Sequence, residues 1–237
     1  MEIEVLNNPD MVAQKAASII AREAREAVAL RGCFIIAVSG GKTPWKMLRA
    51  LADENVPWEG IHILQVDERL APYGHPDRNM THLRESLSSV VPLLAGRIHA
   101  MPVEENDPEA AADSYAQTIR EIAGSPAIID LIHLGLGPDG HTASLIPGDP
   151  VLEVNNKDVA LTGIYQGRQR LTLTYPIINR AGRILWVITG SEKSEMLKRL
   201  TDNDLSIPAG RVSQDNAIVL ADIDAATSIQ HPAPSTK

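Results

Sequence analysis

Three segments of this chain are mostly apolar, Cys33–Val38, Ile128–Leu134 and Arg183–Thr189, and each leads into a turn that contains glycine. A strand that is covered on both faces has this composition, whereas a strand with one wet face alternates apolar and polar residues. Stretches with helical periodicity lie between them, for example from Pro9 to about Leu30 and from about Asp107 to Ile122. This alternation predicts a parallel sheet with helices packed on both faces.

The fold class that follows is α/β. We expect a Rossmann-like, open, mainly parallel sheet with helices on both faces, plus a small additional strand region in the carboxyl half, at about 158–164 and 170–174. The length of 237 residues suits one domain, 1–237. The polar, proline-containing tail, 230–237, is expected to be disordered.

Composition restricts the classes of partner. The net charge of -8 and an aromatic content of 3% argue against general binding to nucleic acids or membrane surfaces. Cys33 is the only cysteine, so no intramolecular disulfide can form, as is typical of proteins in a reducing compartment. The amino terminus has no signal-peptide pattern, and no apolar run could span a bilayer. We therefore expect a cytoplasmic protein, either a monomer or a homodimer.

The turn from Gly135 to Gly148 is the strongest candidate for an active site, because it places Asp139 and His141 directly after a predicted buried strand. We expect a helix to begin there. Gly135, Gly137 and Gly140 also match the G-x-G-x-x-G pattern of dinucleotide-binding folds. Two features disfavour a nicotinamide cofactor: Asp139 would set a carboxylate against the pyrophosphate, and the acidic residue expected further along is missing from a strand end.

A second turn, residues 39–44, reads Ser-Gly-Gly-Lys-Thr-Pro and follows the strand Cys33–Val38. Backbone N–H groups at the start of a helix bind phosphate, so Ser39, Gly40, Gly41 and Thr43 are candidate oxyanion ligands. An ATP-binding P-loop is excluded, because Ile36 stands where its first glycine is required. The alternative is an ordinary glycine-rich turn.

The third turn begins with Asp67, Glu68 and Arg69 and continues as a long loop to Arg78, after which Asn79 is expected to cap a helix. Two interpretations remain open. The charges form a solvated cluster, or Asp67 orients Arg69 so that the guanidinium binds a phosphate. The carboxyl third holds three further cations, Arg168, Arg170 and Lys193, and a single cation of this kind is more often a surface residue than a ligand.

The segments SGGKTP, DERLAPYGHPDRN and GLGPDGHTASLIPG, in this order and spacing, resemble the 6-phosphogluconolactonases of the pentose phosphate pathway. The resemblance extends to RLTLTYPIINRA and TGSEKSEML and covers roughly residues 9–225. It implies a fold similar to that of glucosamine-6-phosphate deaminases and ribose-5-phosphate isomerases. The sequence departs from the family pattern mildly, at Lys42, at Leu70-Ala71 and at Ile146.

The resemblance implies hydrolysis of 6-phospho-D-glucono-1,5-lactone to 6-phospho-D-gluconate, without a metal or an organic cofactor. We expect His141 to act as the general base, kept neutral by the start of a helix, and Asp139 to hold its imidazole. Ser39, Gly40, Gly41, Thr43 and Arg69 are then expected to bind phosphate or sugar oxygens, and the other candidate ligands are Asp67, Asn79, Arg170 and Lys193.

Two alternative functions remain at this point. A phosphosugar deaminase or isomerase shares the Asp-Gly-His turn, but the carboxylate that deaminases carry shortly after it is absent from residues 143–147. A non-catalytic phosphosugar sensor would be expected to carry a DNA-binding segment, and the chain has no basic helix-turn-helix extension.

Overall fold

The mostly apolar segments form the central strands of a seven-stranded sheet. The computed structural model describes residues 1–94 and 96–230. Every pairing in this sheet is parallel, which confirms the predicted sheet type. From one edge to the other, the strands are β1 (Glu2–Leu6), β10 (Ala217–Asp222), β9 (Arg183–Ile188), β6 (Leu131–Leu134), β2 (Phe34–Val38), β3 (Ile61–Gln65) and β5 (Ile98–His99).

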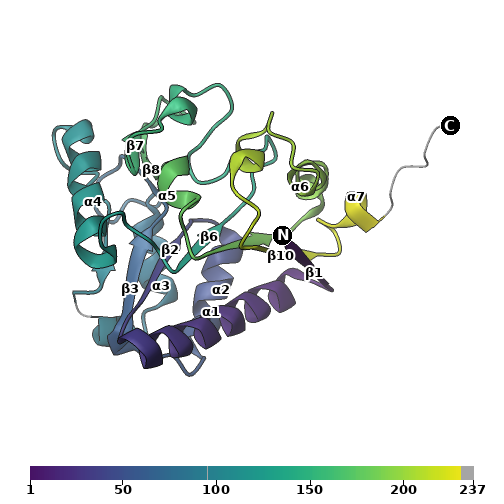
Figure 1. Ribbon diagram of the computed structural model, residues 1–237, viewed down its shortest axis with the longest axis horizontal. Coiled ribbons are helices and arrows are strands. Elements are labelled where there is room, and N and C mark those ends of the chain that lie inside the picture. The colour runs from purple at the N-terminus through teal and green to yellow at the C-terminus, as the bar shows by residue number, and fades with distance from the viewer. Residues whose placement is uncertain (95, 231–237) are drawn as a thin grey trace.

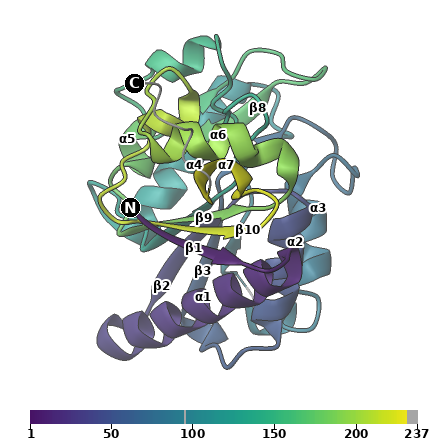
Figure 2. The same cartoon turned by 90° about the vertical axis from the view of Figure 1, so that its right-hand side faces the viewer.

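Helices cover both faces of the sheet, as predicted (Figure 2). One face carries α1 (Pro9–Arg31), α2 (Lys42–Ala52) and α3 (Asn79–Ser86), and the other carries α4 (Pro108–Ala123), α5 (Tyr175–Ile178), α6 (Ser194–Thr201) and α7 (Thr227–Gln230). Alternate residues of β2 enter the two cores: Phe34 and Ile36 pack toward α1, and Ile35 packs on the opposite side. Burial on both faces explains why the strand is apolar throughout.

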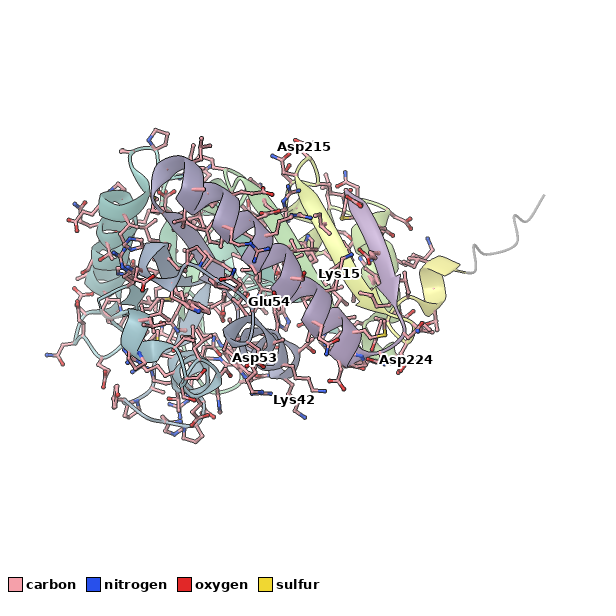
Figure 3. The ribbon with its side chains drawn as sticks, turned by 90° about the horizontal axis from the view of Figure 1, so that it is seen from below. Lys15, Lys42, Asp53, Glu54, Asp215 and Asp224 are labelled. Carbon is pink, nitrogen blue, oxygen red and sulfur yellow. The ribbon has the colours of Figure 1, made fainter. Side chains whose placement is uncertain are left out.

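The ends of the longest helix follow from its sequence. Asn8 accepts a hydrogen bond from the Met11 amide at 2.9 Å, and Pro9 occupies the first turn, where a missing N–H costs nothing. Gly32 ends the helix in the left-handed conformation, with φ of 79°. Figure 3 shows α1 lying diagonally across the sheet. The predicted helix from Pro9 to about Leu30 is therefore confirmed.

A second, antiparallel sheet consists of β4 (Asp67–Arg69), β8 (Arg170–Leu173) and β7 (Val159–Leu161), in that order. It confirms the additional strand region expected in the carboxyl half. The prediction of a continuous loop from Asp67 was wrong, however, because β4 pairs with β8, about 100 residues further along the chain. A strand of three residues is too short to show a periodic pattern, so only its distant partner reveals it.

The remaining regular structure is a set of short 3-10 helices, at Trp58–Gly60, Val91–Leu94, Pro150–Glu153, Ser191–Lys193 and Pro208–Arg211. None of the helices in the described part of the chain combines the length and hydropathy needed to cross a bilayer. Of the tail predicted to be disordered, 230–237, Gln230 ends α7, and residues 231–237 lie outside the described residues.

The strand order reverses between β2 and β6. From β2 the chain proceeds outward to β3 and β5, returns through α4 to β6, and then builds β9 and β10 in the opposite direction. Figure 1 shows β2 between β3 and β6. The loops after β2 and β6 therefore leave the sheet on different sides of this point. In open α/β sheets, ligands bind in the crevice that such a reversal creates.

Candidate active site

A cleft of about 700 Å³ lies at the carboxyl ends of these strands. Its size is in the range of small-molecule sites. Figure 3 labels two residues of its lining, Lys42 and Asp224, on the side of the molecule where α1 begins. Of the predicted site residues, the structure brings all except Asp139 into the lining, namely Ser39, Gly40, Gly41, Thr43, Asp67, Arg69, Asn79, His141, Arg170 and Lys193.

Asp139 lies directly behind His141. Its Oδ1 atom is 2.5 Å from His141 Nδ1 and also accepts a hydrogen bond from the His141 amide at 3.2 Å. Because a carboxylate accepts hydrogen bonds, Nδ1 is the nitrogen that donates to Asp139, and in the neutral ring Nε2 carries the free lone pair. Burial raises the pKa of Asp139, but the charge of His141 and its hydrogen bonds outweigh this effect, and the pKa lies below its ordinary value.

The turn that carries the pair differs from the prediction. Residues 141–149 form successive turns, so the expectation that a helix begins at His141 was wrong. The backbone closes instead through hydrogen bonds from Gly137 N to His141 O and from Gly140 N to Gly137 O. A Cβ atom at Gly137 would overlap the His141 ring. The glycine is therefore required by the position of the imidazole.

The loop after β2 leads directly into α2, which begins at Lys42. The first N–H groups of a helix lack partners inside it, so the amides of Lys42 and Thr43 are available beside the cleft. The Thr43 hydroxyl lies 2.7 Å from that of Thr189, in the loop after β9. The glycines before α2 allow close approach of a ligand to these amides.

Ser39 is hydrogen-bonded to His133 of β6, a residue that carries no motif in the sequence. The Ser39 amide donates to His133 Nδ1 at 3.2 Å, and its hydroxyl donates to the His133 carbonyl oxygen at 3.1 Å. His133 is fully buried, and burial lowers its pKa to about 3, so the ring stays neutral. The β2–β6 pairing ends at Ala37 and Ile132, and these bonds continue the connection to the edge of the cleft.

Asp67 does not contact Arg69 in the way one interpretation of the sequence required. Its carboxylate accepts hydrogen bonds from the Ser144 hydroxyl at 2.6 Å and from the Asn79 amide group at 3.3 Å. Asn79 also donates to the Asp67 carbonyl oxygen, at 3.0 Å. A Cβ atom at Gly40 would overlap this Asn79 side chain. Asp67 and Asn79 thus hold the loops after β2, β3 and β6 together.

Asn79 is the first residue of α3, but its side chain does not cap the helix as predicted. Glu68, which lies on β4 and not next to the helix in sequence, caps it instead. Its fully buried carboxylate accepts hydrogen bonds at 2.8–2.9 Å and lies 3.6 Å from a guanidinium nitrogen of Arg78. The donors are the side chain of Gln65 and the amides of Arg69, Asn79 and Met80. The Glu68 carboxylate is therefore buried and hydrogen-bonded to other groups of the protein, so it does not belong to a solvated cluster.

Two arginines stand side by side on the small sheet. Arg69 and Arg170 are directly paired across β4 and β8. Arg69 donates to the Asp77 carbonyl oxygen at 2.6 Å, and the Nε atoms of both arginines are buried without a hydrogen-bond partner among the described residues. Burial and the charge of Arg69 lower the pKa of Arg170, although the charge of Asp67 opposes this shift. Such a pair favours an anion between or beside the two guanidinium groups.

The other cations noted in the carboxyl third differ in where their side chains lie. Lys193 lines the cleft, whereas Arg168 turns away from it and donates to Asp77 Oδ2 at 3.0 Å. Lys42 and Lys46 also belong to the lining, in which five Lys and Arg side chains stand beside four Asp and Glu side chains, although the chain as a whole is acidic. Within residues 1–94 and 96–230, no group of three or more His, Cys, Asp or Glu side chains is arranged to hold a metal ion.

An open parallel sheet with a polar cleft at its switch point defines a Rossmann-like α/β protein of the class that binds small ligands at its strand ends. Within that class, the chain belongs to the family described as glucosamine-6-phosphate isomerases/6-phosphogluconolactonase, whose model matches residues 7–220. This family is the one that the sequence motifs indicate.

Comparison with individual proteins adds detail to this family assignment. A 6-phosphogluconolactonase of Synechocystis sp. is 38% identical over 200 residues, which are 83% of this chain and 83% of that protein. The structure of a 6-phosphogluconolactonase from Thermotoga maritima is 26% identical, with a TM-score of 0.82 over 93% of this chain and 98% of that chain. A monomeric glucosamine-6-phosphate deaminase reaches a TM-score of 0.83 at 20% identity, over 96% and 99% of the two chains. The fold alone therefore does not separate lactone hydrolysis from deamination.

Proposed function

We propose that this chain hydrolyses 6-phospho-D-glucono-1,5-lactone to 6-phospho-D-gluconate, in the oxidative pentose phosphate pathway. The relatives named 6-phosphogluconolactonase support this substrate. The observation that carries the proposal is the Asp139–His141 pair at the edge of a cleft that also contains paired arginines. Lactone hydrolysis needs a base for water and a binding site for a phosphorylated sugar, and the cleft offers both.

The chemistry begins with a water molecule next to His141. The Nε2 atom takes a proton from this water as its oxygen attacks C1 of the lactone, and the carbonyl oxygen gains the negative charge. Asp139 stabilises the imidazolium that forms and keeps its ring oriented. The C1–O5 bond then breaks, and the imidazolium returns the proton to O5. The open-chain acid loses its own proton to solvent and leaves as the carboxylate.

The phosphate of the substrate requires cations and N–H donors. Arg69, Arg170 and Lys193 supply the charge, and the amides at the start of α2 supply backbone donors. Ser39 acts through the position of its loop, because its amide and hydroxyl hydrogens are already donated to His133. Asp67 and Asn79 keep the loops of the cleft in place. No step of this scheme uses a metal or an organic cofactor.

Deamination of glucosamine 6-phosphate is the second candidate, and the fold likeness to a deaminase is what keeps it in view. The turn after His141 argues against it. Residues 143–147 read Ala-Ser-Leu-Ile-Pro and offer no further carboxylate for ring opening. Ser144, which has the only hydroxyl in this segment, donates its proton to Asp67.

The decisive experiment measures 6-phosphogluconate formation from freshly prepared 6-phosphogluconolactone, with the spontaneous rate subtracted. A rate far above background supports the proposal. Ammonia release from glucosamine 6-phosphate, with no acceleration of lactone hydrolysis, would replace it with the deaminase function. Neither activity, in a folded protein that binds 6-phosphogluconate, would indicate a sensor.

Replacing Arg69 with alanine should mainly raise KM. The guanidinium is expected to bind the phosphate equally in the ground state and the transition state, so its loss weakens binding without changing kcat. A hydrogen bond to a charged group contributes roughly 1.5–3 kcal/mol, which corresponds to an increase in KM of about 10- to 100-fold. Steady-state kinetics test this, with Arg84→Ala on the last turn of α3 as a control. A fall in kcat at constant KM would contradict the assignment.

The substitution Gly137→Ala should lower kcat by about 10-fold or more, because a misplaced base loses part of the ~10²–10⁴-fold that general-base catalysis supplies. The new methyl group would displace the His141 ring from Asp139. Gly135→Ala is the matched change, since a Cβ atom there meets nothing within 4 Å. We expect the second variant to keep its kcat. Equal kcat values for the two variants would remove the steric argument.

Three further expectations belong to this proposal. The chain functions as one lactonase domain over residues 1–237, its location is cytoplasmic, and it works as a monomer or a homodimer. The short connection between the two sheets supports the first, because β4 of the small sheet follows β3 of the large one after a single residue. Light scattering of the purified protein distinguishes monomer from dimer.

A further inference from the structure

The hairpin between β7 and β8 ends in a tight turn beside the catalytic pair. Tyr165 N donates to Arg168 O at 2.9 Å, and Arg168 N donates to Tyr165 O at 3.2 Å. The two residues between them, Gln166 and Gly167, both have positive φ, at 51° and 80°. This is the geometry of a two-residue type I′ hairpin turn. The turn fixes the direction in which Tyr165 leaves the backbone.

The Tyr165 side chain contacts three functional groups at once. Its hydroxyl donates to Asp139 Oδ2 at 3.5 Å, the oxygen that the His141 ring does not use. Its ring meets the His141 ring edge to face, with centroids 5.9 Å apart. The guanidinium carbon of Arg170 lies 5.1 Å from the centroid of the same ring. The catalytic pair and one of the cleft arginines therefore share a single aromatic side chain.

The hairpin is anchored so that this arrangement persists. Arg168, at the other end of the turn, donates to Asp77 Oδ2 at 3.0 Å and to the Leu70 carbonyl oxygen at 3.4 Å, which ties the hairpin to the loop after β4. Burial and the nearby charge of Asp139 raise the pKa of Tyr165, so the phenol keeps the proton that it donates. Tyr165 is not part of the cleft lining.

We propose that Tyr165 is a positioning residue that couples the orientation of the general base to the binding of the substrate phosphate. Its hydroxyl holds the Asp139 carboxylate so that Oδ1 stays on His141 Nδ1. Its ring face supports the guanidinium of Arg170 by a cation–π contact, which keeps that group turned toward the cleft. The inference rests on the proposed function for its kinetic consequences, and on the geometry alone for its spectroscopic ones.

Two variants separate the two contacts. Tyr165→Phe removes only the hydroxyl, so kcat should fall by about 2- to 10-fold, the effect of one hydrogen bond, with KM unchanged. Tyr165→Leu also removes the aromatic face, so KM should rise by about 3- to 30-fold in addition. The dissociation constant of 6-phosphogluconate, measured by calorimetry, should rise with KM in the second variant only. Tyr73→Phe is the matched control, because Tyr73 is 75% exposed and its hydroxyl has no partner among the described residues.

A second measurement does not depend on activity. In the wild-type protein, the Nδ1 proton of His141 should give a downfield NMR resonance, assigned by its loss in His141→Ala. This resonance should shift or broaden in Tyr165→Phe and stay unchanged in Tyr73→Phe. An unchanged resonance would overturn the role of the hydroxyl, even if the protein proved not to be a lactonase.

The kinetic outcomes are equally distinct. An active wild type with both Tyr165 variants at wild-type kcat and KM overturns the coupling and leaves the proposed function intact. If kcat falls equally in both variants while KM and the dissociation constant of 6-phosphogluconate stay at their wild-type values, the proposed role of the contact between Tyr165 and Arg170 is overturned. An inactive wild type refutes the lactonase function, and the resonance together with the dissociation constants then decides the inference.

Discussion

Replacing His141 with alanine is expected to lower kcat for lactone hydrolysis by about 100- to 10,000-fold, the range that a positioned general base contributes. The fold should be retained, because the His141 side chain is partly exposed and its main contact is with Asp139 in the same turn. The measurement is the rate of 6-phosphogluconate formation above the spontaneous rate, together with a circular dichroism spectrum and a melting curve.

His82→Ala is the matched control for this variant. His82 also lies beside a carboxylate, with its Nδ1 atom 3.2 Å from Glu85 Oε2, but it is a partly exposed residue of α3 and does not line the cleft. We expect its activity to equal that of the wild type. A folded His141→Ala variant with near-normal kcat would show that another group activates the water, and Asp139 would then lose its assigned role as well.

The largest effect on stability is expected at Glu68. Replacing it with leucine removes a fully buried carboxylate that accepts hydrogen bonds from the start of α3 and from β4, and it leaves the buried Arg78 guanidinium without this partner. Removing one partner of a buried ion pair lowers the free energy of unfolding by about 3–5 kcal/mol. Urea denaturation followed by circular dichroism measures the change.

Glu85→Ala serves as the comparison, because Glu85 lies on α3, the helix whose first amides donate to Glu68, and its side chain is 67% exposed. Surface ion pairs contribute about 0–1 kcal/mol, so we expect little change. If Glu68→Leu were no less stable than Glu85→Ala, the buried carboxylate could not be what holds β4 and α3 together. The arginine pair would then need another support.

The sequence predicted the large sheet well because its central strands are buried on both faces. Continuous apolar runs such as Phe34–Val38 cannot belong to a surface strand, and the glycines that follow them mark the strand ends. The loops that carry Ser39 and His141 could be located for the same reason. Their meeting in one cleft follows from the parallel arrangement, which brings all carboxyl ends to one edge.

What the sequence could not predict depends on contacts between distant segments. The pairing of Arg69 with Arg170 joins residues about 100 positions apart, and neither strand has a strong pattern. The helix expected at His141 was wrong because glycines and polar residues suit either a helix start or a series of turns. Tyr165 and His133 carry no motif signal, and only their neighbours in space give them a role.

The first and last strands of the large sheet are neighbours: Glu2 of β1 pairs with Ile218 of β10 (Figure 2). During synthesis, β1 leaves the ribosome long before the strand that it needs exists. The nascent chain can therefore pair β2, β3 and β6 first, whereas β1 stays unpaired until β10 has been translated. Contacts of such long sequence separation form late and slowly. We therefore expect β1 and β10 to pair after the middle of the sheet has formed.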